Sequence, residues 1–164
     1  MDRNRGVGPR PGRAQVVGLI REIGDGPLAL DTAAFIYFIE EHPRFLPLLD
    51  PVFSSIDKGR LPATASSLTL LEVLVVPYRA GNDPLAERYE QILTRSRGLH
   101  LIDLDRSQLR AAAHLRALHP GLRTPDAIQI SAALSGGCSA LLTNDRHLPE
   151  IPGLRILQLE DFAA

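Results

Sequence analysis

Four acidic residues of this chain occupy positions from which carboxylates can act together. Asp31 follows the short apolar run Pro27–Leu30, and Asp145 follows another such run. Glu72 interrupts an apolar segment, where a charge is costly to bury unless it is paired or bound to a metal. Asp126 lies at the start of a predicted helix. Carboxylates that converge repel one another, and Mg²⁺ or Mn²⁺, which prefer oxygen ligands, relieve that repulsion. Such an ion can activate water against a phosphodiester, so the acids indicate metal-dependent phosphodiester hydrolysis.

Each acid also has a purely structural explanation. When each acid is considered alone, the sequence leaves the structural and the functional explanation open. Asp31 suits the N-cap of the following helix. Glu72 can lie on the one solvated stripe of its helix. Asp126 follows Thr124–Pro125 in a first helical turn, where the helix dipole favours an anion. Asp145 lies in a turn, and turns favour Asn and Asp. The functional interpretation therefore depends on whether the fold brings the four together.

The elements that must position these acids alternate along the chain. Strands are predicted at Leu28–Asp31, Pro62–Ala65, Leu99–Leu101, Ala140–Leu142 and Leu154–Leu157. Helices are predicted at Ala14–Ile23, Ala33–Glu40, Phe45–Asp57, from Leu68 to a break at Gly81, Pro84–Arg97, Ser107–Leu118 and Thr124–Ser135. This alternation predicts an α/β fold with a mostly parallel sheet covered by helices on both faces. In such a sheet, strand ends and the starts of the following helices share one edge, so the acids can converge there.

Length and composition set further limits. The 164 residues predict a single domain over 14–164, preceded by a disordered tail over 1–13 that is rich in Arg, Gly and Pro. The net charge of -1 favours no particular partner, so a nucleic-acid ligand requires a local basic patch. The single cysteine, Cys138, excludes an intrachain disulfide and fits a reducing cytoplasm. No apolar run approaches the roughly 20 residues of a membrane span.

Four segments, in their order and spacing, resemble one family of proteins. They are Leu30–Tyr37, Ser67–Val73, Thr124–Gln129 and Leu142–Leu148. Together they are similar to the PIN-domain family, and within it to the VapC-like toxin ribonucleases of bacterial toxin–antitoxin pairs. The resemblance extends over about Leu28–Leu159. It implies a PIN-like three-layer α/β/α sandwich with an acidic pocket that holds Mg²⁺ or Mn²⁺. It also implies an endoribonuclease, a hydrolase that cleaves single-stranded or structured RNA.

The resemblance transfers to particular residues. It assigns catalytic and metal-binding roles to the four acids, Asp31, Glu72, Asp126 and Asp145. Thr143 matches a hydroxyl position that would orient a neighbouring carboxylate, and Asn144 is expected to support the same site. Arg123 and Arg146 flank two acids and suit either a phosphate or a carboxylate. Arg146 is the favoured RNA contact. The chain departs from the family at Ala33, where Asn or Ser is frequent, so one supporting hydrogen bond is expected to be missing.

The resemblance also implies partners, and other functions compete with it. Many such toxins are homodimers bound by a cognate antitoxin, whose C-terminal segment fills a groove near the active site. The main alternative is a catalytically inactive PIN-like module that binds RNA or a protein, although such a module would be expected to lack one of the acids. A haloacid-dehalogenase-like phosphatase would need a second aspartate at position 33, which is Ala33. A dinucleotide-binding domain would need a glycine motif after the first strand, and none is present.

Overall fold

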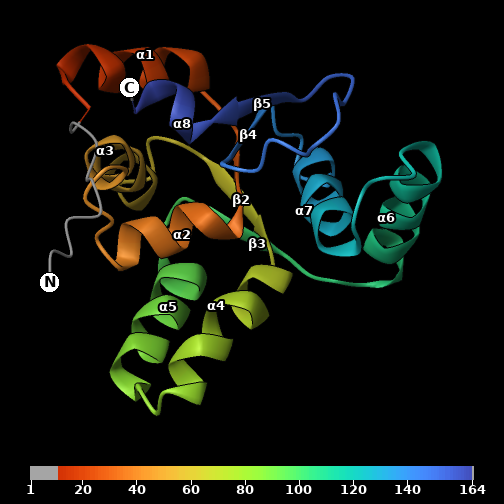
Figure 1. Ribbon diagram of the computed structural model, residues 1–164, viewed down its shortest axis with the longest axis horizontal. Helices are drawn as coiled ribbons and strands as arrows, with labels where there is room; N and C mark the ends of the chain where they lie inside the picture. The colour runs from red at the N-terminus through yellow and green to blue at the C-terminus, as the bar shows by residue number, and fades with distance from the viewer. Residues whose placement is uncertain (1–10, 164) are drawn as a thin grey trace, which may run out of the picture.

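The computed structural model of the protein describes residues 11–163. Within that range, five strands and eight helices alternate (Figure 1). They are α1 (Arg13–Ile23), β1 (Leu28–Leu30), α2 (Thr32–Ile39), α3 (Leu46–Asp57), β2 (Ala63–Ser66), α4 (Leu68–Arg79), α5 (Asp83–Arg95), β3 (Leu99–Ile102), α6 (Arg106–Leu118), α7 (Thr124–Ser135), β4 (Ala140–Thr143), β5 (Arg155–Gln158) and α8 (Leu159–Phe162). Most of the tail predicted over 1–13 lies outside the described residues, and the boundaries of the tail and the domain stay predictions.

The order of the strands reverses beside β1. The sheet runs β3-β2-β1-β4-β5, and every pairing between the described strands is parallel, as predicted. From the central β1 the chain adds β2 and β3 on one side and then returns to place β4 on the other. Leu30 pairs with Leu142 across this junction. A reversal of this kind is a topological switch point, and open α/β sheets bind ligands outside the carboxyl ends of the strands there.

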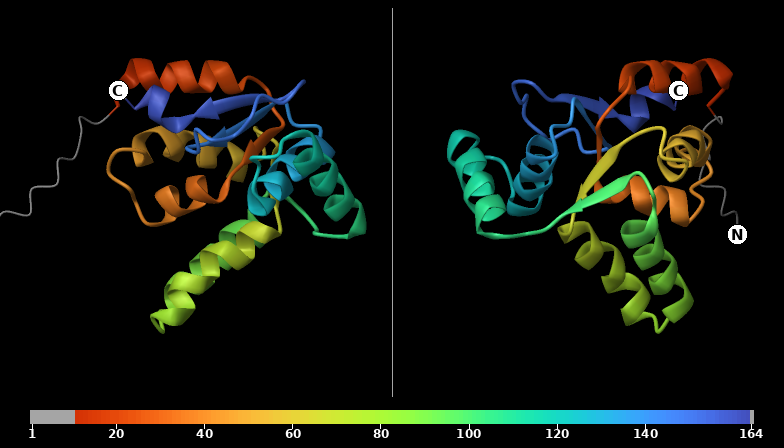
Figure 2. Two further views of the ribbon diagram at one scale, coloured as in Figure 1. Left: turned by 45° about the vertical axis from the view of Figure 1, so that its right-hand side comes forward. Right: turned by 180° about the vertical axis from the view of Figure 1, so that it is seen from behind.

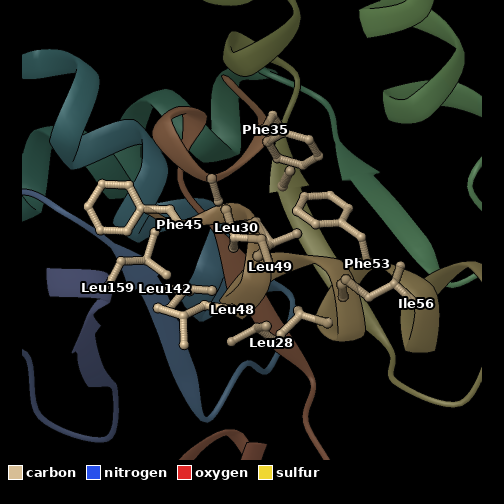
Figure 3. Packing of buried hydrophobic residues seen from close by; sticks show 14 of the residues in the cluster. Leu28, Leu30, Phe35, Phe45, Leu48, Leu49, Phe53, Ile56, Leu142 and Leu159 are labelled. Carbon is tan, nitrogen blue, oxygen red and sulfur yellow. The ribbon is translucent and has the colours of Figure 1, made fainter. Parts of the chain in front are cut away.

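Alternating strand side chains bind helices to both faces of the sheet. Leu28, Leu30 and Leu142 point into one cluster with residues of α1, α2, α3, α5 and α8. Figure 3 shows part of that cluster, with Phe35, Phe45, Leu48, Leu49, Phe53, Ile56 and Leu159 around these strand residues. Ala29 and Leu141 point to the other face, where they pack with α6 and α7. Because strand side chains alternate between faces, the result is the predicted three-layer α/β/α sandwich.

Helix α7 crosses the sheet close to β2 and carries one of the acids. Its bounds are those predicted, because Pro125 favours a first helical turn and Gly136 follows the last residue. A Cβ atom on Gly136 would lie 2.8 Å from the Thr64 hydroxyl oxygen of β2, so glycine permits this close approach. The four-residue helix α8 was not predicted, since it is too short to show a helical period.

Helices α4 and α5 form a hairpin that extends away from the sheet (Figure 2). Outside its contacts with α5, helix α4 exposes large apolar side chains, Leu71, Val75, Val76 and Tyr78. No helix within residues 11–163 is both long enough and apolar enough to cross a membrane. The hairpin places the inner end of α4, with Glu72, beside the start of α2.

Candidate active site at the switch point of the sheet

Asp31 lies at the switch point, directly after β1, and is held by three hydrogen bonds. Its Oδ1 accepts from the backbone N–H of Thr32 at 2.7 Å, which caps α2. Its Oδ2 accepts from the hydroxyl of Thr143, the last residue of β4, at 2.7 Å. Its own N–H donates to the carbonyl of Leu142 at 3.1 Å. Asp31 is therefore both the helix cap that local sequence predicts and a carboxylate oriented by the neighbouring strand.

The surroundings of Asp31 disfavour its negative charge. Burial raises the pKa of Asp31, and the nearby charges of Glu72 and Asp126 raise it further. The hydrogen bonds from Thr143 and Thr32 act in the opposite direction, but the pKa remains above its ordinary value. Three carboxylates from β1, α4 and α7 thus lie close enough to repel. A bound cation would relieve this repulsion.

Glu72 is fixed by polar side chains that the sequence reasoning did not single out. Its Oε1 accepts from the Thr32 hydroxyl at 2.9 Å and from the Gln129 amide at 3.2 Å. The same amide donates to the Thr69 hydroxyl at 3.0 Å. Gln129 follows Asp126 by three residues, a spacing that places both on one helix face. This spacing is the feature of the sequence from which Gln129 could have been predicted as part of the site. Thr32 provides a hydroxyl beside the position where Ala33 lacks one.

Asp126 and Asp145 are linked to each other by Arg123. The Arg123 Nε lies 3.3 Å from Asp126 Oδ2, and its Nη2 lies 3.8 Å from Asp145 Oδ2. Asp145 Oδ1 also accepts from the backbone N–H of His147 at 2.9 Å. A pocket of about 350 Å³ borders this group and is lined by Gly121, Leu122, Arg123, Asp126 and His147. Asp145 therefore joins the other acids through an arginine rather than directly.

The loop after β4 is anchored to the C-terminal helix. The side-chain oxygen of Asn144 accepts from the backbone N–H of Glu160 at 3.1 Å. Arg146 forms an ion pair with Asp161. Both side chains thus stabilise the loop that carries Asp145. The predicted roles of Asn144 beside the metal and of Arg146 on RNA stay predictions.

The donor set of the site is of the kind that a divalent cation prefers. Within residues 11–163, no group of three or more His, Cys, Asp and Glu side chains is arranged to hold a metal ion. The chemical nature of the side chains nevertheless suits such an ion, because they offer carboxylate and hydroxyl oxygens. The carboxylates also repel one another when no cation is bound. A guanidinium already lies between Asp126 and Asp145. Mg²⁺ is commonly bound through one or two carboxylates with several waters retained, so an open arrangement suits it.

The fold and site define an α/β/α protein with a group of carboxylates at the switch point of a parallel sheet. The sequence pattern of the PIN domain matches residues 28–154. The chain belongs to the PIN-domain family, as its motifs predicted. A comparison of the sequence with curated proteins finds no match.

Solved structures with similar folds come from toxin–antitoxin complexes. One is VapBC2 from Rickettsia felis bound to a DNA fragment from their promoter, with a TM-score of 0.62 and 20% identity, covering 80% of this chain and 97% of that chain. A toxin–antitoxin complex from Klebsiella pneumoniae has a TM-score of 0.59 and 20% identity, and the match covers 77% of this chain and 94% of that chain. DNA-bound VapBC from Salmonella typhimurium has a TM-score of 0.57 and 23% identity, covering 80% and 97%. At these identities the likeness establishes the fold.

Proposed function

We propose that the protein is a Mg²⁺- or Mn²⁺-dependent endoribonuclease and the toxin of a toxin–antitoxin pair. The observation that carries the proposal is the state of Asp31, a largely buried carboxylate oriented by Thr143 and flanked by Glu72 and Asp126. A helix cap alone does not need two further acids beside it. Membership of the PIN-domain family supports a nuclease. The single cysteine supports a cytoplasmic location.

The proposed chemistry assigns distinct tasks to the residues of the chain. Asp31, Glu72, Asp126 and Asp145 would together hold the ion, directly or through its bound waters. When bound, a divalent cation lowers the pKa of water and offsets charge on the attacked phosphate. Thr143 keeps one oxygen of Asp31 directed by its hydrogen bond. The amide of Gln129 and the hydroxyl of Thr32 keep Glu72 aligned through their hydrogen bonds to its Oε1.

The proposed protein partner is a cognate antitoxin, because the structures with similar folds are toxin–antitoxin complexes. The exposed apolar side chains of α4 (Leu71, Val75, Val76 and Tyr78) lie on the helix that carries Glu72, which suits a partner that covers the pocket. A homodimer is part of the same proposal. Co-expression with a cognate antitoxin should suppress RNA cleavage and yield a stable complex.

The decisive experiment uses the purified full chain and a fluorophore-labelled single-stranded RNA. Cleavage is expected with Mg²⁺ or Mn²⁺ and is expected to stop in excess chelator. Asp31→Asn keeps the shape of the side chain but loses the charge, so it should abolish cleavage. Asp83→Asn, at the exposed outer end of the α4–α5 hairpin, is the matched control and should cleave like the wild type.

Two results would contradict the proposal. Full cleavage by Asp31→Asn, or in excess chelator, would show that any nuclease activity is independent of this site. RNA binding without cleavage in either metal would instead support the inactive PIN-like module. Thermal melting of both variants separates loss of chemistry from loss of folding.

A further inference from the structure

Arg123 occupies a position that the proposed reaction does not yet use. Its guanidinium contacts Asp126 at 3.3 Å and Asp145 at 3.8 Å. These two carboxylates are 19% and 21% exposed, whereas the Arg123 side chain is 76% exposed. The positive charge is therefore supplied from the solvent side to acids that are mostly enclosed. An exposed ion pair of this kind is weak and readily exchanged.

The pocket beside the acids gives the Arg123 side chain a second place to act. Arg123 lines this pocket of about 350 Å³ together with Asp126 and His147, so its guanidinium already faces the space beside the acids. Arg116 fixes the backbone that leads to Arg123, because its Nε donates to the carbonyl of Leu122 at 3.0 Å and its Nη1 to Thr124 at 2.8 Å. The Arg123 side chain can therefore reorient while its backbone stays in place. A planar guanidinium is well suited to bind a phosphate with two hydrogen bonds.

We propose that Arg123 is a switchable counter-ion that couples metal binding to RNA binding, an inference that rests on the proposed function. In the metal-free protein it neutralises Asp126 and Asp145. A divalent cation that binds these carboxylates displaces the guanidinium. The freed side chain then binds a phosphate of the RNA in the adjacent pocket. Arg123 is thus a competitor of the metal before substrate binds and a ligand of the substrate afterwards.

The first test measures Mn²⁺ binding to the RNA-free protein by calorimetry. Arg123→Gln removes the competing charge, so Mn²⁺ should bind about two- to tenfold more tightly than to the wild type, the range expected for two exposed ion pairs. Arg155→Gln is the matched control, because Arg155 is also exposed and forms one ion pair with Glu22 at 3.4 Å. Its Mn²⁺ affinity should equal that of the wild type.

The second test measures steady-state cleavage of the single-stranded RNA at saturating Mn²⁺. Loss of a charged hydrogen bond to a phosphate should raise KM about tenfold in Arg123→Gln, with a smaller change in kcat. Arg123→Lys keeps the charge but not the planar guanidinium, so its KM should lie between that of the wild type and that of Arg123→Gln. Arg155→Gln should leave both constants unchanged.

The outcomes separate this inference from the proposed function. Mn²⁺ affinity in Arg123→Gln that equals or falls below the wild-type value would overturn the inference, even if the protein cleaves RNA. An unchanged KM would overturn the phosphate-binding step. If the wild type binds no Mn²⁺, the proposed function fails and the inference fails with it.

Discussion

The hydrogen bond from Thr143 to Asp31 provides a quantitative test of how the site is built. Thr143 is fully buried, and its hydroxyl donates to Asp31 Oδ2 at 2.7 Å. The hydroxyl oxygen of Thr143 also accepts a hydrogen bond from the backbone N–H of Asp145 at 3.1 Å. Thr143→Val keeps the branched shape of the side chain and removes both hydrogen bonds. It should therefore destabilise the protein without creating a cavity.

The expected cost follows from the two lost bonds. A hydrogen bond to a charged group contributes about 1.5–3 kcal/mol, and an ordinary one about 0.5–1.5 kcal/mol. Thr143→Val should lower the free energy of unfolding by about 2–4 kcal/mol at neutral pH. The hydroxyl of Thr143 lowers the pKa of Asp31, so it stabilises the charged form. The cost should shrink as the pH falls through the pKa of Asp31 in the folded protein.

Urea unfolding in excess chelator measures this cost, with two further variants as controls. Thr143→Ser retains the hydroxyl and should lose much less stability. In an Asp31→Asn background, Thr143→Val should cost less than in the wild type, because the partner is no longer charged. A loss below about 0.5 kcal/mol, or an equal loss in both backgrounds, would refute the assigned hydrogen bond. Mn²⁺ affinity should also fall about 10–100-fold, as for other residues that orient a metal ligand.

Four substitutions test other features. Gly98→Ala should cost about 1–3 kcal/mol or more in urea unfolding, because its Cβ would lie 2.4 Å from a backbone carbonyl of α3. Gly121→Ala, with open space around the added atom, should cost little, and an equal loss would contradict the steric account. Asp31→Asn should raise the urea midpoint at pH 7 without metal, since burial and neighbouring acids raise the pKa of Asp31; the gain should vanish below the ordinary carboxyl pKa of about 3.9. Burial and Glu40 raise the pKa of Tyr89, whose hydroxyl donates to that carboxylate at 2.7 Å, so stability should fall as the pH rises above about 10, where the unfolded state ionises. Tyr89→Phe should cost about 1.5–3 kcal/mol at pH 7 and abolish the alkaline loss; an unchanged loss would show another group to be responsible.

Local sequence predicted those elements whose starts and ends are determined by residues within or next to the element. Thr124–Ser135 was predicted with both bounds, because proline at its start and glycines at its end act within the helix itself. The parallel sheet followed from the alternation of strands and helices. The placement of β4 beside β1 was not predictable in the same way, since it depends on packing between segments far apart in the sequence. The short helix α8 carried too few residues for a pattern.

The site divides along the same line. The four acids were visible as unusual charges, and Asp31 as a helix cap was visible from its neighbours. The partners of Glu72 were not, because Gln129 lies 57 residues away from it. Arg123 was recognised as flanking an acid, but the sequence could not show that it contacts two. Side-chain partners across the sheet depend on register, which the sequence does not display.

The separation between the two residues at the switch point determines when the site can exist. Asp31 and Thr143 are 112 positions apart, and β1 stays without its β4 neighbour until nearly the whole domain has been made. At ribosomal rates of about 5–20 residues per second, that interval lasts on the order of ten seconds. During that interval the nascent chain already contains Asp31, but the site around Asp31 is still incomplete. Any partner that must restrain this pocket has that interval in which to be made ready.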